Sequence, residues 1–398
     1  MKSDWKIVTI NDCADVVGDG LHGTPQYSQN GEYAFVNGNN LINGKVVIKS
    51  DTKRVIFSEF EKYKKELNDR TILVSINGTL GNVSAYNNEK IILGKSVCFI
   101  NVKNGYDKNF LFYVLSSPTF RNYMETNSTG TTIKNFSLKQ MREYSFSLPD
   151  ICLQKKIAAI LSALDEKIAT NRAINDNLQQ QAQTIFKSWF VDFEPFDGKQ
   201  PNTWRSEKLG DVCNCVLGGT PSRAKPEYWN GTIPWINSGE VNNFRIIKPS
   251  ETITDLGLSK SATKLLPAKT TVIAITGATL GQVSLLEIDA CANQSVVGII
   301  PNSNYPYEYI YPLIKENINQ LISHQTGGAQ QHINKQNVES LDILVPDTSD
   351  LGKYRSTVCG LYEMITNNCF ENERLETIRD LLLPRLMSGE IDVLKIDL

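Results

Sequence analysis

Two stretches of this chain carry apolar residues at alternating spacings of three and four, the pattern of a coiled-coil helix rather than of a strand. The seam positions of the first stretch are Leu161, Leu164, Ile168, Asn171, Asn175, Leu178, Ala182 and Ile185. Those of the second, 197 residues later, are Val358, Leu361, Ile365, Asn368, Asn372, Leu375, Arg379 and Leu382. The pattern predicts a helix and linker in residues 150–197 and a C-terminal helix in residues 347–398.

Asparagine takes the same two positions in both seams, and this predicts how the helices pair. If they run antiparallel, Asn171 meets Asn372 and Asn175 meets Asn368. All remaining pairs but the second are apolar: Leu161–Leu382, Leu164–Arg379, Ile168–Leu375, Leu178–Ile365, Ala182–Leu361 and Ile185–Val358. A slip by one heptad would leave buried amides unpaired at about 1–3 kcal/mol each, so the asparagines are predicted to fix the coiled-coil register. The alternative is that each helix packs on its own module with its asparagines in water.

Runs of β-branched and aromatic residues, bounded by Gly, Asn and Pro, predict strands elsewhere. They are Thr71–Ile76, Ser96–Val102, Tyr144–Leu148, Thr271–Thr276, Ser295–Ile300 and Leu341–Val345. Asp107–Tyr123 and Tyr307–His324 have the spacing of amphipathic helices instead. These elements together predict an α+β fold.

The part of the chain before each long helix is a repeat of the other. Thr71–Ser84 (TILVSINGTLGNVS) matches Thr271–Ser284 (TVIAITGATLGQVS) at a shift of 200 residues. Further matches in the same order are Trp5 with Trp204, Gly23–Pro25 with Gly219–Pro221, Val36–Asn37 with Ile236–Asn237, Ser96–Val97 with Ser295–Val296, Thr129–Gly130 with Thr326–Gly327, and Leu148–Asp150 with Val345–Asp347. A period this long indicates a duplicated domain, not a solenoid. We expect two repeated α+β domains, 1–149 and 198–346, separated by two long helices that form an antiparallel coiled coil with pseudo-two-fold symmetry.

The length of the seam suggests a spacer function. Residues 161–185 span about 37 Å at about 1.5 Å per residue, and one turn of B-DNA measures about 34–36 Å. Two modules at the ends of such a spacer would reach half-sites about one turn apart. Antiparallel helices would also let one chain imitate a two-fold dimer while its halves differ.

Charge separates the modules from the helices. The net charge of −2 argues against a generic nucleic-acid coat. Residues 1–149 carry +4, residues 150–197 carry −2, residues 198–346 are balanced, and residues 347–398 carry −4. A polyanion is therefore expected on the modules, and protein partners on the acidic helices. With no apolar leader, no apolar run long enough for a membrane and eight scattered cysteines, we expect a cytoplasmic protein with reduced thiols and no membrane partner.

Polar loops at matching places in the two modules carry the side chains that bond base edges and phosphates. The DNA-binding candidates of the first module are Thr24, Gln26, Tyr27, Asn37, Asn39, Asn40, Thr79, Lys95, Thr131, Thr132, Lys134 and Asn135. Those of the second are Thr220, Ser222, Arg223, Lys225, Asn237, Ser238, Thr279, Gln294, Gln330, Gln331 and His332. For a single residue, an exposed turn without function is the simpler explanation. As a set placed alike yet differing in content, the loops favour sequence readout.

We find no catalytic constellation in the sequence. Pro149–Asp150 followed by Asp165–Lys167 resembles a nuclease motif, but the second acid falls on the heptad helix, so we interpret it as coincidence. There is no phosphate-loop or dinucleotide fingerprint, and the three histidines show no triad or metal spacing. The chain is predicted to be a non-catalytic binding protein without a metal site.

The order of these features resembles that of type I restriction-modification DNA specificity subunits. It begins with a Trp and a Gly-Thr-Pro loop, here called the GTP loop (Gly23–Pro25 and Gly219–Pro221). A Thr-Leu-Gly turn, the TLG turn (Thr79–Gly81 and Thr279–Gly281), and a Thr-Gly loop, the TG loop (Thr129–Gly130 and Thr326–Gly327), follow. Then come Leu-Pro-Asp and a helix ending in FKSWF, and the repeat ends in LLPRLMSGEI. The resemblance covers nearly the whole chain and is strongest in Ser147–Phe190 and Leu344–Ile391. One departure concerns the family's Pro-Pro-x-x-Glu-Gln stretch: residues 149–154 keep only its glutamine, Gln154, and residues 346–351 lack it.

The resemblance implies two target recognition domains, each reading one half of a bipartite double-stranded DNA site. It implies that the helices dock two methyltransferase subunits and, in the full complex, restriction subunits. S-adenosylmethionine, ATP and Mg²⁺ would be used by those partners and not bound by this chain. Two other functions stay open: a scaffold or modulator that binds a methyltransferase without productive DNA binding, and a nuclease that acts alone.

Overall fold

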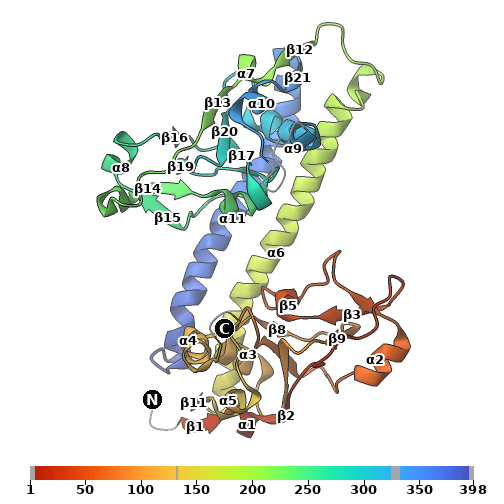
Figure 1. The fold of residues 1–398 in the computed structure, drawn as a ribbon, viewed down its shortest axis with the longest axis vertical. Helices are drawn as coiled ribbons and strands as arrows, with labels where there is room; N and C mark the ends of the chain where they lie inside the picture. Colours follow the sequence, from red (N-terminus) through yellow and green to blue (C-terminus); the bar gives the residue numbers. More distant parts are fainter. Residues whose placement is uncertain (1–4, 131–132, 324–331, 394–398) are drawn as a thin grey trace. The chain divides into compact units, whose positions relative to one another are not determined.

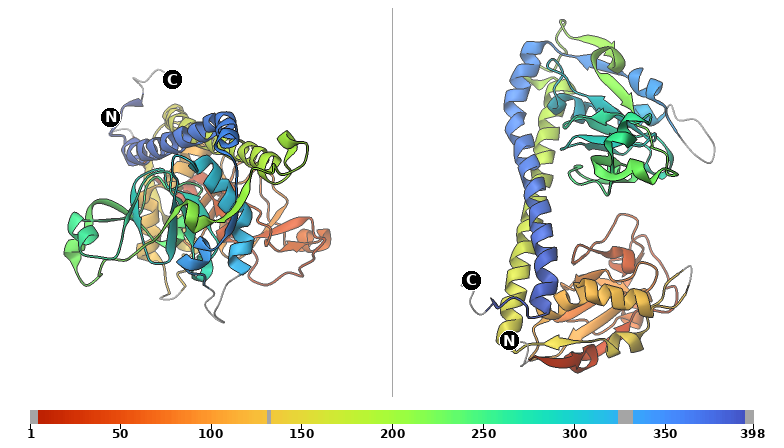
Figure 2. Two further views of the ribbon diagram at one scale, coloured as in Figure 1. Left: turned by 90° about the horizontal axis from the view of Figure 1, so that it is seen from above. Right: turned by 90° about the vertical axis from the view of Figure 1, so that its left-hand side faces the viewer.

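The computed structural model describes residues 5–130, 133–323 and 332–393. The chain divides into two compact units, Met1–Glu166 with Leu375–Leu398, and Lys167–Arg374. Each unit contains one module and a part of both long helices (Figure 1). In each unit taken alone, the strands lie to one side of the helix segments (Figure 2).

The first module is built on a central antiparallel sheet. Its central sheet has the order β2 (Ala14–Asp19), β10 (Val97–Val102), β7 (Thr71–Ser75) and β8 (Val83–Ala85). The smaller sheets are β1 (Lys6–Thr9) with β11 (Ser145–Leu148), β6 (Arg54–Val55) with β3 (Tyr33–Val36) and β9 (Ile91–Leu93), and β4 (Leu41–Ile42) with β5 (Lys45–Val46). Every residue of β7 and β10 is buried. Side chains alternate between two cores, with Ile72 and Ile100 in one and Leu73 and Phe99 in the other, so both faces of the sheet are covered.

The helices of the first module are α1 (Ile10–Cys13), α2 (Phe57–Tyr63), α3 (Lys108–Ser116), α4 (Pro118–Asn127) and α5 (Leu138–Glu143). The prediction of a single helix over Asp107–Tyr123 is wrong, because the helix is interrupted at Ser117, between α3 and α4. Pro118 disfavours helical backbone at Ser117, which is extended with ψ 149°. The Ser117 hydroxyl instead caps α4 by accepting from Phe120 N.

The second module repeats this plan with longer peripheral strands. Its central sheet has the order β13 (Asn214–Leu217), β20 (Val296–Ile300), β17 (Thr271–Ala274) and β18 (Val283–Leu285). Beside it lie β12 (Arg205–Lys208) with β21 (Asp342–Val345), and a sheet of β15 (Glu251–Ile253), β14 (Trp229–Ile236), β19 (Ala290–Ala292) and β16 (Leu265–Leu266). Its helices are α7 (Leu209–Val212), α8 (Asp255–Ser259), α9 (Tyr307–Ser323) and α10 (Lys335–Glu339). The helix predicted at Tyr307–His324 is α9, and His324 lies outside the described residues.

The pairing of the strands corrects the shift of 200 residues between Thr71–Ser84 and Thr271–Ser284. Strand β7 pairs Leu73 with Ser84, whereas β17 pairs Val272 with Ser284. The first strand of each hairpin therefore corresponds at a shift of 199, and the second strand at 200. The second module has one extra residue in the turn between them, and a match by letters alone would turn every β17 side chain to the wrong face.

The long helices are α6 (Ile151–Phe190) and α11 (Thr348–Met387). In the second unit they run antiparallel, and both predicted asparagine pairs are present. Asn171 Nδ2 donates to Asn372 Oδ1, and Asn368 Nδ2 donates to Asn175 Oδ1, each at 2.9 Å. Asn171 and Asn175 are buried, so the alternative in which they face water is wrong.

In the first unit, Arg379, the charged residue among the predicted seam positions, pairs with an acid next to Leu164. Arg379 Nη1 lies 2.8 Å from Asp165 Oδ1, and the hydroxyl of Tyr113 on α3 donates to Asp165 Oδ2 at 2.7 Å. Asp165, the second acid of the nuclease-like motif, therefore joins both helices to the module. Gln154 has a similar position: it is buried, its Oε1 accepts from Asp107 N, and its Nε2 donates to Pro149 O.

We predict that Asn372→Leu destabilises the chain by about 1 kcal/mol, because the buried amide of Asn171 loses Asn372 Oδ1 and keeps only Glu371 Oε2 as an acceptor. The double variant Asn171→Leu with Asn372→Leu should recover most of that loss, since two leucines fit a heptad seam. Chemical denaturation of each variant measures the coupling. Gln180→Leu, on the exposed side of α6, is the matched control. Additive losses in the double variant would contradict the paired arrangement.

Candidate nucleic-acid interface

Loops from four parts of the first module come together at one edge of its central sheet. Gly20 N donates to Val97 O and Gly94 N donates to Val36 O, which brings the GTP loop and the β3 end to the β9–β10 turn. Ile76 N donates to Ser96 O, and Gly78 N donates to Lys134 O. We call the assembled segments Asn37–Asn40, Asn77–Gly81, Gly94–Ser96 and Ile133–Asn135 the first loop face.

A short 3-10 helix, η2 (Gly38–Asn40), forms the centre of the first loop face. Its cap Asn37 accepts from the Ser96 hydroxyl at 3.0 Å, and the same hydroxyl oxygen accepts from Gly38 N. Asn40 is 4% exposed; its Oδ1 accepts from Asn37 N and its Nδ2 donates to Val47 O and Thr52 Oγ1. Asn40 was predicted as a DNA-binding candidate, but its buried amide makes its hydrogen bonds within the module, so its role there is structural. Asn39 beside it is exposed.

The TLG turn and the TG loop lie against each other. Asn77 and Asn135 form an isolated antiparallel bridge, and Asn77 Nδ2 donates to Asn135 Oδ1 at 3.4 Å. Gly78 and Gly81 have φ of 74° and 76°, a backbone that other residues rarely adopt. The candidates Thr79, Lys95, Lys134 and Asn135 are exposed on this face. Asn77 was not among the candidates, although an asparagine before a turn glycine is a usable signal.

The remaining candidates of the first module, Thr24, Gln26 and Tyr27, lie on the segment that includes the GTP loop and leads away from the first loop face. Thr24 is exposed. Gln26 N donates to Glu59 Oε2 on α2, and the ring of Tyr27 lies 5.8 Å from that of Phe35 on β3. Gln26 and Tyr27 thus contact α2 and β3.

The second module assembles a matching second loop face from Asn237–Asn242, Thr276–Gly281, Asn293–Ser295 and His332–Ile333. The same backbone bonds hold it: Gly218 N to Val296 O, Asn293 N to Ile236 O, and Ile275 N to Ser295 O. Asn237 caps the 3-10 helix η5 (Ser238–Asn242) as Asn37 caps η2, and its Oδ1 accepts from Gly239 N. Candidates Ser238 and Thr279 are half-buried here, and Gln294 is exposed with Oε1 accepting from the Thr220 hydroxyl.

The two faces share a scaffold and differ in side chains. The bridge between the turn and the TG loop is Thr276–His332 in the second module, where the first has Asn77–Asn135. The turn itself includes a 3-10 helix, η6 (Gly277–Thr279), which accommodates the extra residue. Thr131, Thr132, Gln330 and Gln331 lie outside the described residues.

The second module presents an arginine held in one orientation. The Arg223 guanidinium lies 3.5 Å from the ring centre of Trp229 and pairs with Glu251 through Nη1–Oε1 at 2.5 Å and Nη2–Oε2 at 2.9 Å. This pairing holds the pKa of the Glu251 carboxyl below its usual range. Ser222 is exposed beside it, and Lys225 Nζ donates to the Tyr228 hydroxyl at 3.0 Å, which raises the pKa of the lysine.

A buried ion cluster attaches the loop after η5 to the helices in the second unit. Arg245 Nε lies 3.3 Å from Glu287 Oε1, and both side chains are almost fully buried. The cluster is completed by Lys269, which pairs with Glu287, by Thr366 on α11, which donates to Glu287, and by Tyr311 on α9 and Gln179 on α6, which accept from Arg245. No sequence signal distinguished these charges from surface residues.

The described residues include no group of three or more metal-ligating side chains. All eight cysteines are unpaired, and burial raises the pKa of the Cys213 and Cys215 thiols to about 12. None of the helices in the described ranges is both long and apolar enough to cross a membrane.

Comparison with known proteins identifies the duplicated plan. Residues 2–180 and 201–353 match the family described as the type I restriction modification DNA specificity domain. The specificity subunit of the type I restriction enzyme MjaIX from Methanocaldococcus jannaschii is 26% identical, over 98% of this chain and 94% of the relative. That of HindI from Haemophilus influenzae is 26% identical, over 71% of this chain and 77% of the relative.

A solved structure has the same fold. The S subunit of a type I restriction-modification system from M. genitalium superposes with a TM-score of 0.58 and covers 96% of both chains. Because the sequence identity is 18%, this likeness concerns the fold alone.

The burial of Asn40 predicts a difference between two neighbouring asparagines. Asn40→Ala should destabilise the chain by about 1–3 kcal/mol, because the Asn37 N–H and the Val47 carbonyl lose a buried partner. Asn39→Ala is the matched control and should leave stability within about 0.5 kcal/mol, as is usual for exposed positions. Denaturant titration of the two variants measures both. Equal losses at the two positions would contradict the structural role of Asn40.

Proposed function

This chain belongs to the family of type I restriction-modification DNA specificity proteins, and from that premise we propose that each of its two loop faces reads one part of a bipartite DNA sequence. The chain is then the DNA sequence-specificity subunit of a type I restriction-modification complex. The observation that carries the proposal is the pair of loop faces, which share backbone bonds and capping asparagines but present different side chains.

The side chains exposed on the faces suit base and phosphate contacts. Lysine, arginine, asparagine and glutamine bond guanine, adenine and phosphate oxygens, and each good bidentate contact discriminates by about 1–3 kcal/mol. The first face presents Asn39, Lys95, Lys134 and Asn135. The second presents Gln294 and His332, with Arg223 on the neighbouring loop. Since the two sets differ, the two half-sites are expected to differ.

The long helices are proposed to dock the enzymatic partners. Apolar side chains stay exposed on them, with Ile174 39% and Met364 49% exposed in the second unit, and Ile378 45% and Leu381 64% exposed in the first. A coiled coil whose seam is already filled does not need these side chains for its own packing. We propose that they contact methyltransferase subunits, one on each helix-and-module unit, with restriction subunits added in the full complex. Methyl transfer from S-adenosylmethionine, and the use of ATP and Mg²⁺, are assigned to those partners, and this chain is proposed to be non-catalytic.

The first prediction for this function concerns methylation. The chain is co-expressed with its cognate methyltransferase, and N6-methyladenine is mapped across the host DNA. We expect methylation at an asymmetric two-part sequence. Lys134→Ala with Asn135→Ala should relax one half only, and Arg223→Ala the other half only, since a lost base contact costs about 1–3 kcal/mol, on the order of tenfold or more in discrimination.

Lys139→Ala, whose side chain is 81% exposed on α5, is the matched control and should leave the methylated sequence unchanged. Changes in both halves from a substitution in one module would contradict independent readout. A complex that assembles with the methyltransferase but methylates nothing would favour the scaffold without productive DNA binding.

The helices generate a second prediction, about the unread spacer. Seven residues are inserted into α6 after Glu166 and seven into α11 after Arg374, in an order that continues both seams. Each helix lengthens by about 10.5 Å at about 1.5 Å per residue. One turn of B-DNA, about 10 base pairs, measures about 34 Å, so the spacer between the half-sites should grow by about three base pairs. Methylation mapping reads the spacer directly. An unchanged spacer with an active complex would show that the helices do not set it.

A further inference from the structure

The second module contains a hollow of about 250 Å³ beside its TLG turn. It lies wholly within the second unit and is lined from the end of η5, the β17–β18 turn and α9. The lining residues that matter here are Asn242, Asn243, Gln282, Tyr311 and Lys315. The hollow borders the segments that carry Ser238 and Thr279, but none of its lining residues was a DNA-binding candidate.

The floor of the hollow carries a hydroxyl group with an unused proton. Tyr311 is 1% exposed. Its Oη accepts from Arg245 Nη1 at 3.0 Å and from Lys315 Nζ at 3.5 Å. Both interactions use the oxygen as an acceptor, and within the described chain the Tyr311 hydroxyl donates to no residue. A buried O–H between two cations calls for an acceptor, and a negatively charged one fits best.

The rim adds further donors. The side-chain amides of Asn242, Asn243 and Gln282 are exposed and make no hydrogen bond to any described residue. No carboxylate is among the described residues that line the hollow. The nearby acid Glu287 is turned to Arg245 and Lys269 in the buried cluster. The hollow is therefore lined by a cation, a hydroxyl and amides that can turn their N–H groups inward, and no described carboxylate lines it.

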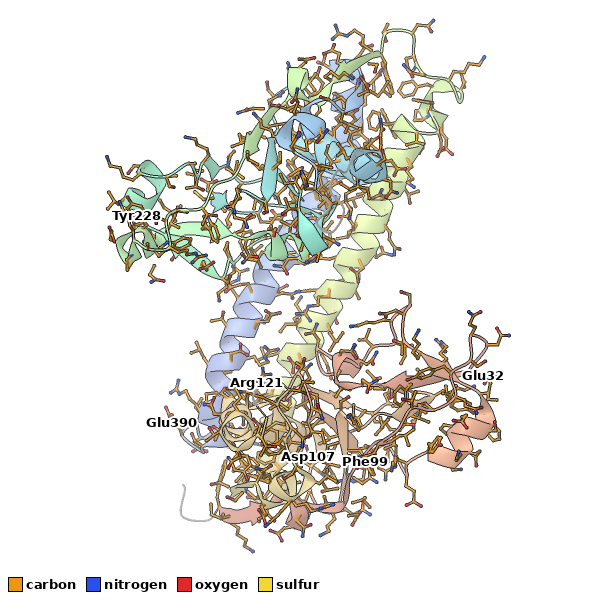
Figure 3. The ribbon with its side chains drawn as sticks, in the orientation of Figure 1. Glu32, Phe99, Asp107, Arg121, Tyr228 and Glu390 are labelled. Carbon is orange, nitrogen blue, oxygen red and sulfur yellow. The ribbon has the colours of Figure 1, made fainter. Side chains whose placement is uncertain are left out.

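The first module places a cation at the corresponding turn. Figure 3 shows Arg121 in the first module. Gly81 corresponds to Gly281 of the second module, and Arg121 on α4 packs against Gly81, with Nη2 donating to Gly81 O at 3.4 Å. Arg121 is exposed. In the second module, Ile318 and Ile322 of α9 pack against Gly281, and Lys315 on the same helix lines the hollow beside the turn. Both modules therefore have a cation near this turn, although it does not occupy the same position in each.

We propose that this hollow binds a phosphate group of the DNA backbone, with Lys315, Tyr311 and the rim amides as donors, and that Arg121 makes the equivalent contact in the first module. The inference rests on the proposed DNA-reading function and adds to it a place for the backbone. A DNA phosphate held beside the TLG turn would set the distance between the DNA strand and the loop face, although the phosphate carries no sequence information. Lys315 and Arg121 are positioning residues for readout.

The test uses the complex with the methyltransferase and a duplex that contains the methylated site. Lys315→Gln keeps the length of the side chain and removes its charge. Because a neutralised phosphate releases its counterion, the slope of log affinity against log salt should fall by about 0.9, and affinity at moderate salt on the order of tenfold. The methylated sequence should stay the same. Lys208→Gln on β12 is the matched control and should change neither quantity.

Several outcomes overturn the assignment. If the wild-type complex binds its site but Lys315→Gln matches the control in slope and affinity, the hollow does not hold a DNA phosphate, and the proposed function stands. If the recognised sequence changes, Lys315 contacts a base instead. If the wild-type complex itself binds no specific site, the proposed function fails and the assignment fails with it.

A second variant separates the hydroxyl from the lysine, and a second ligand separates DNA from free phosphate. Tyr311→Phe should lower affinity for specific and unrelated duplexes alike, in protein whose unfolding transition shows it to be folded. The full chain alone is also titrated with inorganic phosphate while its thermal unfolding is followed. Protection that is lost in Lys315→Gln, together with unchanged DNA binding, would mark a free-phosphate site and overturn the proposal.

Discussion

The structure depends on the amide pairs in the seam between α6 and α11. Each amide has a partner across the seam in one register, Asn171 with Asn372 and Asn368 with Asn175. Leucine pairs would tolerate a slip by a heptad, whereas a displaced amide would lose its buried partner at about 1–3 kcal/mol. In the second unit this register also fixes which residues of α11 meet the module, because Thr366 joins the cluster around Arg245 and Glu287. The polar seam residues thus determine where the module is attached.

Attachment differs between the two units in chemistry but not in logic. In the first unit, Arg379 of α11 and Tyr113 of the module both bind Asp165 of α6. In the second, Arg245 and Glu287 of the module bind Gln179 of α6 and Thr366 of α11. The charges of Arg245 and Glu287 are buried and would be costly without their partners, whereas those of Arg379 and Asp165 are half-buried. Each module is therefore tied to both helices at once, and a loop face cannot shift along one helix alone.

The sequence predicted those features whose signal is periodic or repeated. The heptad with asparagine at fixed positions predicted the helix pair, and the repeated glycine turns predicted matching loops. Three features had no local signal. The extra residue in the second turn is invisible in a letter match that reads Thr71–Ser84 against Thr271–Ser284 without a gap. The burial of Asn40 depends on Val47 and Thr52, which fold back over it. Arginine usually lies at the surface, and only the contact with Glu287 in the folded module explains why Arg245 is buried. The early end of helix α3 did have a local signal, Pro118. The prediction followed the amphipathic pattern and did not take the proline into account.

The two loop faces show how one scaffold serves two readings. The bonds that hold each face run between backbone atoms or through the capping asparagines, so they do not depend on the exposed side chains. Exposed positions can therefore change without unfolding the loop, as Asn135 opposite Asn77 becomes His332 opposite Thr276. Backbone contacts place a different demand on the module, because a phosphate is the same in every sequence. A cation at the TLG turn meets that demand in both modules, from Arg121 in one and Lys315 in the other, while the residues facing the bases are free to diverge.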